Sequence, residues 1–142
     1  MTKTEWMQMY ELVGAAQEVY NQLGRGMAEP IYQSAMEEEL KIRSIDFKRE
    51  VPLKLWYKGV LLKKIYIADF VSNDIIIEFK SVDKICSEHR AQLFNYLRIT
   101  KQKYGLLVNY GEDHFHSERY VYDEHTDRFE LITKDNLSKY VH

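Results

Sequence analysis

The chain has 142 residues, of which 45% are hydrophobic and 30% are charged, the balance of an ordinary globular domain. This composition excludes a disordered tail and a collagen-like chain, and no apolar run approaches the roughly 20 residues that a membrane-spanning helix needs. We therefore expect a single domain over 1–142. Twenty basic and twenty-two acidic residues give a net charge of −2, so contact with nucleic acid would require a local basic patch, a metal ion or a partner.

The N-terminal residues lack a basic stretch followed by an apolar core, so no secretory signal is visible. The single cysteine, Cys86, excludes an internal disulfide. Together these observations favour a cytoplasmic protein that makes no contact with a membrane.

Apolar residues recur at three- and four-residue steps in the first part of the chain, the pattern of amphipathic helices. Gly24 and Gly26 end the first helix, and Pro30 suits the first turn of the second. From Phe47 onward, apolar and polar residues mostly alternate, as in strands. The expected helices are 4–23, 30–43, 87–100 (capped by Ser87) and 135–140, and the expected strands are 47–57, 60–71, 75–80, 104–109, 116–122 and 128–132. The order α-α-β-β-β-α-β, followed by a β-hairpin and a short helix, predicts an α/β fold with a mixed sheet covered by helices.

Asn73 and Asp74 tolerate positive φ angles and predict a tight turn between two strands. With this turn, paired residue numbers sum to 147, which places Asp69 opposite Glu78 on one side of the sheet. Lys80 lies two residues beyond Glu78 and shares that side. Opposed like charges among apolar neighbours destabilise a hairpin, and a divalent cation such as Mg²⁺ removes that cost. The spacing predicts a metal site, and a salt bridge between Lys80 and one acid at a sheet edge fits it as well.

Three further polar residues are candidates for the same site. Gln92 and Tyr96 are four residues apart on helix 87–100 and share a face, which approaches Lys80 when the helix packs back over the sheet. A core tyrosine beside a solvated glutamine fits that spacing equally well. Glu29 stands at the start of the second helix, where a carboxylate also complements the helix dipole. We expect Gln92 and Glu29 to approach Lys80 from helices on the same face of the sheet.

These residues belong to motifs that follow the order of a known family. The motifs are Gly26-Met27-Ala28-Glu29-Pro30-Ile31-Tyr32, Ala68-Asp69, Glu78-Phe79-Lys80, the stretch 91–97 and the stretch 108–111. Over 14–111 the chain resembles the GxxExxY proteins of the PD-(D/E)xK nuclease superfamily, with Ala68 in place of the superfamily's proline. The resemblance implies a restriction-endonuclease-like core.

The resemblance also implies roles for single residues. It makes the catalytic residues Asp69, Glu78, Lys80, Gln92, Glu29 and Tyr96, of which Asp69, Glu78 and Glu29 hold Mg²⁺ or Mn²⁺. Such a site hydrolyses phosphodiester bonds, because the ion activates water and the lysine stabilises charge on the phosphate. The implied partner is nucleic acid, with DNA favoured over RNA. The alternative is a non-cleaving binding or assembly module with the nuclease fold, acting as an accessory subunit or a homodimer.

Other residue groups form weaker patterns. His114 and His116 share a strand face and could bind zinc, but the spacing fixes no third ligand. Cys86 with His89 could form a thiol nucleophile, but no third residue that would orient the histidine is evident. A buried cysteine with no catalytic role fits the sequence as well. Basic residues and three aromatic residues gather around the first expected hairpin, where they could bind phosphates and stack on bases or simply solvate and pack the surface: Lys48, Arg49, Lys54, Lys58, Lys63, Lys64, Trp56, Tyr57 and Tyr66.

Overall fold

The computed structural model describes residues 1–141, and its elements confirm the predicted α/β class. The helices are α1 (Lys3–Leu23), α2 (Glu29–Ile42), α3 (Ser87–Thr100) and α4 (Leu137–Tyr140). The strands are β1 (Lys48–Leu53), β2 (Trp56–Tyr57), β3 (Val60–Leu61), β4 (Tyr66–Ser72), β5 (Ile75–Lys80), β6 (Tyr104–Asn109), β7 (His116–Asp123) and β8 (Arg128–Leu131). Within residues 1–141, no helix combines the length and the apolar character needed to cross a bilayer.

Six strands form one mixed sheet in the order β1-β4-β5-β6-β7-β8. Strands β5 and β6 run parallel, because α3 crosses over between them, and the other neighbours are antiparallel. In β5 every residue before Lys80 is buried, which is typical of a central strand covered on both faces. Lys80 is therefore the point at which this strand emerges from the core.

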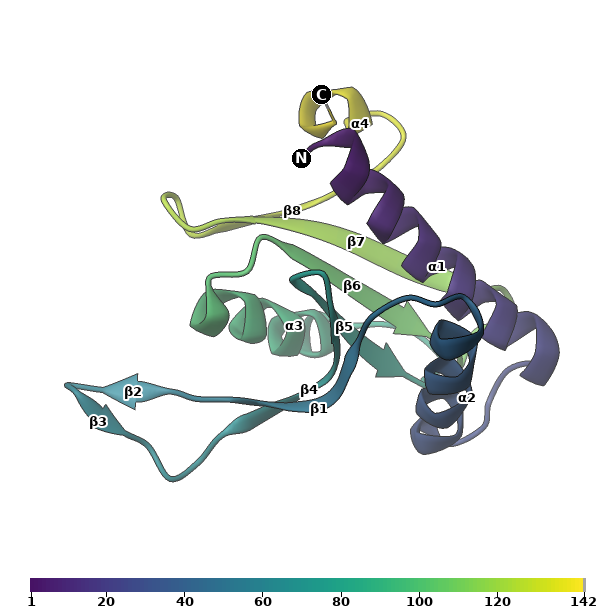
Figure 1. The fold of residues 1–142 in the computed structure, drawn as a ribbon, viewed down its shortest axis with the longest axis horizontal. Coiled ribbons are helices and arrows are strands. Elements are labelled where there is room, and N and C mark those ends of the chain that lie inside the picture. Colours follow the sequence, from purple (N-terminus) through teal and green to yellow (C-terminus); the bar gives the residue numbers. More distant parts are fainter. Residues whose placement is uncertain (142) are drawn as a thin grey trace.

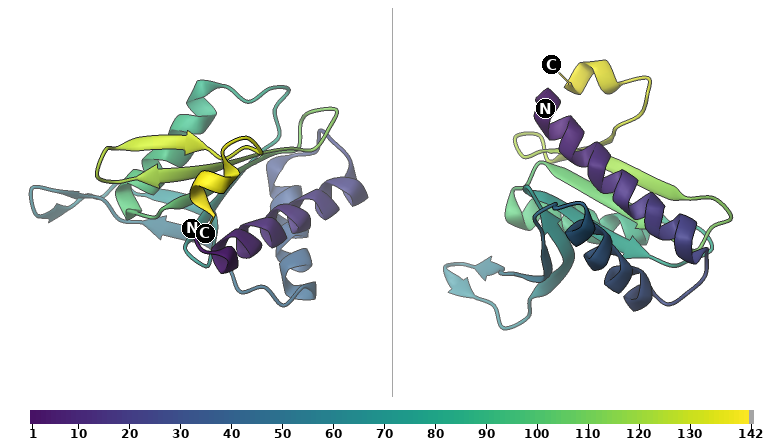
Figure 2. Two further views of the ribbon diagram at one scale, coloured as in Figure 1. Left: turned by 90° about the horizontal axis from the view of Figure 1, so that it is seen from above. Right: turned by 45° about the vertical axis from the view of Figure 1, so that its right-hand side comes forward.

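Helices cover both faces of the sheet, as Figures 1 and 2 show. Helices α1 and α2 pack on one face, over a core that includes Phe70, Ile77 and Tyr110. Helix α3 covers the other face, where Leu93 packs with Ile76. The polar residues of interest thus lie where the central strand β5 leaves a three-layer arrangement.

The two predicted tight turns are present. Asn73 and Asp74 have φ angles of 48° and 65° and join β4 to β5, and Lys58 and Gly59, at 47° and 80°, join β2 to β3. Positive φ at both central residues is what a two-residue type I′ hairpin requires. The Asn73-Asp74 turn therefore sets the register of β4 against β5 next to the candidate site, whereas the Lys58-Gly59 turn sets only the register of β2 against β3.

The predicted strands 47–57 and 60–71 are each interrupted, which the sequence pattern did not indicate. Strand β1 ends at Leu53, and β2 pairs with β3 in a separate two-stranded ribbon that projects away from the helices and the main sheet (Figure 1). All four ribbon residues are exposed, so no core holds them in the main sheet. We call residues 54–65, the ribbon with its two connections, the arm.

Candidate active site

The two strands that carry Asp69 and Glu78 separate at these residues. Strands β4 and β5 pair in the predicted register as far as Phe70 and Ile77, where the ladder ends. Beyond it, Glu78 Oε1 accepts the backbone N–H of Asp69 at 2.9 Å, and Asp69 Oδ2 accepts the backbone N–H of Phe79 at 2.9 Å. The two carboxyl groups therefore take the place of the hydrogen bonds that a continued ladder would have made.

Burial shifts both carboxyl groups toward the protonated form. Glu78 is 2% exposed, and burial together with the charge of Asp69 raises the pKa of Glu78 to about 9. Burial also raises the pKa of Asp69, opposed by hydrogen bonds from the Phe79 amide and from Glu78. These causes describe a protonated Glu78 that donates to Asp69, so Glu78 is neutral near pH 7 when no cation is bound.

The chemistry of this pair suits a hard divalent cation. It offers oxygen ligands, and each carboxyl group keeps one oxygen that is not engaged by the amides of Asp69 and Phe79. Over residues 1–141, no three His, Cys, Asp or Glu side chains lie together in a group able to hold a metal. A site with two carboxylates fits Mg²⁺, which keeps several waters and is often completed by a substrate phosphate.

A hydrogen-bond chain fixes the lysine beside the carboxyl pair. Lys80 Nζ donates to Gln92 Oε1 at 2.6 Å, and Gln92 Nε2 donates to Tyr96 Oη at 2.9 Å. Burial and the charge of Glu78 raise the pKa of Tyr96 to about 12, so its hydroxyl stays protonated. The structure thus brings Gln92 and Tyr96 to Lys80, with the orientation of the glutamine amide set from both ends.

Glu29, the first residue of α2, lies close enough to the site to interact with its charges. Burial raises the pKa of Glu29, the charge of Lys80 lowers it, and the charge of Asp69 raises it. Glu29 does not join Asp69 and Glu78 in a three-residue metal group within the described chain. Its carboxylate is a charged neighbour of the pair, and its role as a metal ligand stays a prediction.

The expectation that Glu29 and Gln92 come from one face of the sheet is wrong. Tyr32 of α2 belongs to the core that α2 shares with α1, whereas Leu93 of α3 belongs to the core on the opposite face. The apolar side of each helix decides which face it covers, and the polar residues follow. Glu29 and Gln92 therefore flank the end of β5 from opposite sides.

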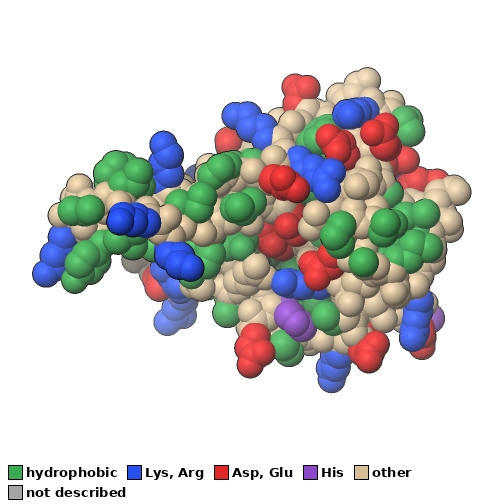
Figure 3. All heavy atoms as spheres, turned by 90° about the horizontal axis from the view of Figure 1, so that it is seen from below, with side chains coloured by type: hydrophobic (Ala, Val, Ile, Leu, Met, Phe, Trp, Pro, Cys, Tyr) green, Lys and Arg blue, Asp and Glu red, His purple; other side chains and the backbone are tan. Residues whose placement is uncertain are grey.

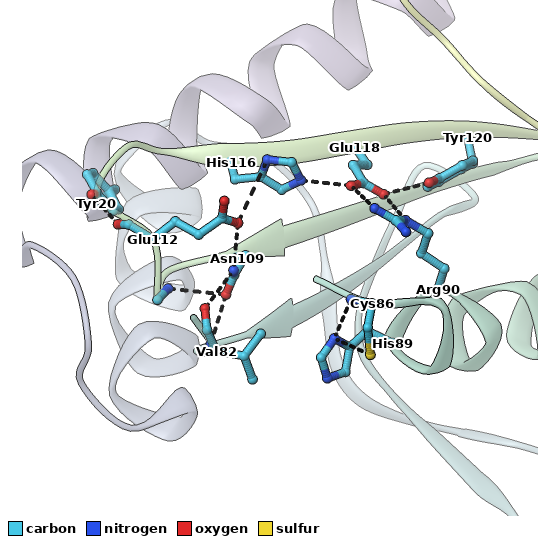
Figure 4. Close-up of polar contacts among 11 residues, drawn as sticks. Tyr20, Val82, Cys86, His89, Arg90, Asn109, Glu112, His116, Glu118 and Tyr120 are labelled. Atoms are coloured by element: carbon cyan, nitrogen blue, oxygen red, sulfur yellow. Dashed lines mark hydrogen bonds and ion pairs between the residues drawn. The ribbon is translucent and has the colours of Figure 1, made fainter. Parts of the chain in front are cut away.

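A buried asparagine supports the turn that follows Lys80, as Figure 4 shows. Asn109 is fully buried; its Oδ1 accepts the backbone N–H groups of Val82 at 3.0 Å and Gly111 at 3.1 Å, and its Nδ2 donates to Val82 O at 2.8 Å. The backbone of Lys80 is itself held by the Tyr110 N–H at 2.8 Å. From the sequence, Asn109 is visible only as part of the motif 108–111; the signal for its role is an asparagine followed closely by a glycine at the end of a buried strand.

An ion pair between partly exposed Arg90 and buried Glu118 attaches α3 to β7, and the sequence pattern did not indicate it. Arg90 binds Glu118 through two hydrogen bonds of 2.8 and 2.9 Å, and His116 and Tyr120 also contact this carboxylate (Figure 4). The hydrogen bonds from these partners outweigh burial and lower the pKa of Glu118 to about 2. This pair holds the helix that carries Gln92 against the sheet.

Three of the four weaker candidates, Cys86, His89 and His116, make structural contacts. Cys86, not Ser87, is the N-cap of α3, and its backbone N–H donates to His89 Nδ1 at 3.0 Å. The ring nitrogen nearest the thiol is thus engaged by an amide, which disfavours a Cys–His nucleophile. His116 is bound to Glu118, and His114 joins no metal-binding group within residues 1–141.

Comparison with known proteins identifies a family and a similar fold. A sequence model of the PD-(D/E)XK nuclease superfamily matches residues 7–121, a range that contains all six predicted site residues. The crystal structure of a protein named SSO0001 is similar in fold, with a TM-score of 0.54 and 23% sequence identity over 68% of this chain and 53% of that chain. The chain thus corresponds to about half of that protein's length. No curated protein sequence matches the chain.

Proposed function

Because the chain belongs to the PD-(D/E)XK nuclease superfamily, we propose that it hydrolyses phosphodiester bonds of nucleic acid with a divalent metal ion, Mg²⁺ or Mn²⁺. The observation that carries the proposal is the pair of half-buried Asp69 and buried Glu78 beside the Lys80–Gln92 hydrogen bond. Buried like charges are costly without a compensating cation, and the pair offers the oxygen ligands that such a cation prefers. The closer likeness to GxxExxY proteins stays a prediction.

In the proposed mechanism, the acidic residues bind the metal ion. Asp69 and Glu78 hold the ion, and Glu78 gives up its proton as it does so, since a ligating carboxylate must be ionised. The ion, when bound, supplies Lewis-acid chemistry that activates water and screens charge on the phosphate. Glu29 adds negative charge at the edge of the site and orients solvent there.

Lys80 stabilises the charge that develops on the phosphate oxygens or orients the attacking water. Its ammonium is a compact charge on a flexible stem, and Gln92 restrains it by accepting from Nζ. A preorganised charge of this kind costs no reorganisation at the moment of reaction. Gln92 and Tyr96 are thus positioning residues that act through Lys80. DNA is the favoured substrate.

A cleavage assay tests the proposal. Wild type is incubated with Mn²⁺ and single- or double-stranded DNA or RNA, next to Asp69→Asn and the control Asp135→Asn, which changes an exposed acid outside the site. We expect cleavage of at least one substrate by wild type and by the control, with loss in Asp69→Asn, whose amide oxygen still accepts from Phe79. Equal cleavage by all three proteins would contradict the proposal. Metal binding without any cleavage would favour the non-cleaving binding or assembly module.

A further inference from the structure

The arm differs from the rest of the chain in charge. Residues 54–65 carry four lysines (Lys54, Lys58, Lys63 and Lys64) and no Asp or Glu, a charge of +4 in a chain of net charge −2, so the other residues together carry −6. The segment free of acids extends from 51 to 68, between Glu50 and Asp69. In residues 1–141 the lysines that form ion pairs are Lys41 and Lys139, so the arm lysines are available to an external polyanion.

The arm also exposes large apolar and aromatic side chains. Trp56 and Tyr57 are 61% and 60% exposed, and as consecutive strand residues they point to opposite faces of the ribbon. Val60 and Leu61, paired with them across the ribbon, are exposed as well. Figure 3 shows this combination, with hydrophobic and basic side chains covering the projecting arm and acidic ones in the middle of the molecule.

The base of the arm touches the candidate active site. Tyr66 begins β4, directly after the arm, and its ring lies 5.4 Å from the ring of Tyr96, centroid to centroid. Tyr96 in turn accepts from Gln92, which binds Lys80. A ligand lying along the arm therefore passes Tyr66 and arrives at the residues that would act on a phosphate.

We propose that the arm binds single-stranded nucleic acid and guides it to Lys80, an inference that rests on the proposed function and names its substrate class. Phosphates pair with the lysines, and unstacked bases lie on Trp56 and Tyr57, as aromatic side chains bind single strands without regard to sequence. In a duplex the base faces are stacked on each other, so they are not free to stack on these two rings. Contact between the arms of two copies is less favourable, because two arms of charge +4 repel each other.

Binding is measured by fluorescence anisotropy in EDTA, where no cleavage occurs, with labelled single strands of about 15 nucleotides of DNA or RNA and the matching duplexes. The variants are Trp56→Ala, Tyr57→Ala and the double variant Lys63→Ala/Lys64→Ala. The matched controls are Tyr10→Ala, an aromatic residue on α1 that is 58% exposed, and Lys134→Ala, an exposed lysine after β8.

We expect each aromatic variant to weaken single-strand binding about 10-fold, as the loss of one stacked base does, and both controls to bind like wild type. The double lysine variant should lower the slope of log K against log salt by about 1.4, since each phosphate contact on a single strand contributes about 0.7. Duplex binding should be weaker than single-strand binding and insensitive to Trp56→Ala.

Unchanged single-strand affinity in all arm variants would overturn the inference, as would equal dependence of duplex binding on the two rings. Arm variants that change the sedimentation coefficient without changing the affinity would assign the arm to contact between copies. Wild type that binds single strands through the arm but cleaves no substrate would contradict the proposed function and leave this inference intact. If wild type cleaves a substrate and the arm variants bind single strands like wild type, this inference is contradicted and the proposed function is left intact.

Discussion

Glu78 Oε1 accepts the backbone N–H of Asp69 at 2.9 Å across the gap where β4 and β5 separate. Asp69 returns the interaction by accepting from the amide of Phe79, the residue after Glu78. Each carboxyl group is therefore held by the strand that carries the other. These two hydrogen bonds hold a buried and a half-buried acid together before any ion arrives, and they tie the protonation of both acids to the stability of the fold.

Stabilisation by Mg²⁺ should increase with pH. The pKa of Glu78 is raised from 4.5 to about 9, so between these values the folded state holds a proton that the unfolded state has lost. Without metal, this group's contribution to the free energy of unfolding falls as pH rises, by at most about 1.4 kcal/mol per pH unit. Ion binding removes the cost of ionising buried Glu78, so the rise in Tm on adding Mg²⁺ should be larger at about pH 8.5 than at about pH 6.

Melting curves of wild type and Glu78→Gln, with EDTA or Mg²⁺, check this prediction. The glutamine variant should lack both the pH trend and the response, and a response equal to that of wild type would place the ion elsewhere.

Lys80→Ala should abolish cleavage with little loss of stability. Removal of a preorganised charge at the reacting group typically costs on the order of 10²–10³ in rate. Stability changes little, because relief from burying part of a cation offsets the lost hydrogen bond to Gln92. Initial rates with Mn²⁺ and melting temperatures are compared for wild type, Lys80→Ala and the exposed control Lys84→Ala. If Lys80→Ala cleaves at the wild-type rate, the activity belongs to another site or to a contaminant.

Gln92→Ala should slow cleavage more than Tyr96→Phe does. The first change frees Lys80 Nζ, whereas the second removes one acceptor of the glutamine amide and leaves the Lys80–Gln92 bond. A lost orienting hydrogen bond of about 1–1.5 kcal/mol corresponds to roughly a 10-fold slower reaction. We expect about that loss for Gln92→Ala, a smaller one for Tyr96→Phe, and partial rescue by Gln92→Glu, which still accepts from Nζ. Single-turnover rates measure it, and the reverse order would exclude the positioning role of Gln92.

Two glycine substitutions should change stability in opposite directions. A Cβ on Gly111 would lie 2.1 Å from the backbone oxygen of Val82, so Gly111→Ala must displace the turn after Lys80 and should cost about 3 kcal/mol or more. A Cβ on Gly14 would meet the flexible end of Arg43 at 3.3 Å. Gly14→Ala, inside α1, should therefore stabilise by about 0.5–1 kcal/mol through helix propensity. Urea denaturation of both variants measures the change in the free energy of unfolding. An unchanged free energy for Gly111→Ala would contradict the close contact with Val82.

Glu118→Gln should destabilise the protein at neutral pH and hardly at all in acid. The folded-state pKa of Glu118 is lowered from 4.5 to about 2, so its contribution is complete above about pH 4.5 and is lost as pH falls toward 2. The full contribution amounts to about 3 kcal/mol at pH 7. Denaturant midpoints of wild type and variant across this pH range measure it. A variant penalty that stays constant with pH would show that packing, and not charge, is responsible.

Local chemistry made much of the fold predictable. Asn73 and Asp74 gave the hairpin, and with it the register that ends at Phe70 and Ile77. The arm was not predictable, because the alternation of apolar residues continues through 54–65 while the core that would hold them is absent. For the same reason, alternation could not show that β4 leaves β5 at Asp69.

The position of helices around the site depended on long-range packing. The sequence gives no sign that α2 and α3 cover opposite faces, since that choice is made by contacts such as Tyr32 against Tyr110. The role of Asn109 was equally unpredictable, because two of its hydrogen bonds join it to Val82, 27 residues away in the chain. The candidate residues themselves could be named from spacing and motif, but not the carboxyl–amide exchange that holds two of them.

The two carboxyl–amide hydrogen bonds also allow the site to be followed by hydrogen–deuterium exchange. The amide protons of Asp69 and Phe79 are protected by side-chain oxygens, whereas the neighbouring amides of β5 are protected by the sheet. Their protection reports on two carboxyl groups individually, and a change in the charge or ligation of either group alters one amide more than its neighbours. The strand gap thus contains two built-in probes, one for each acid, that can follow ion loading without any label on the protein or its substrate.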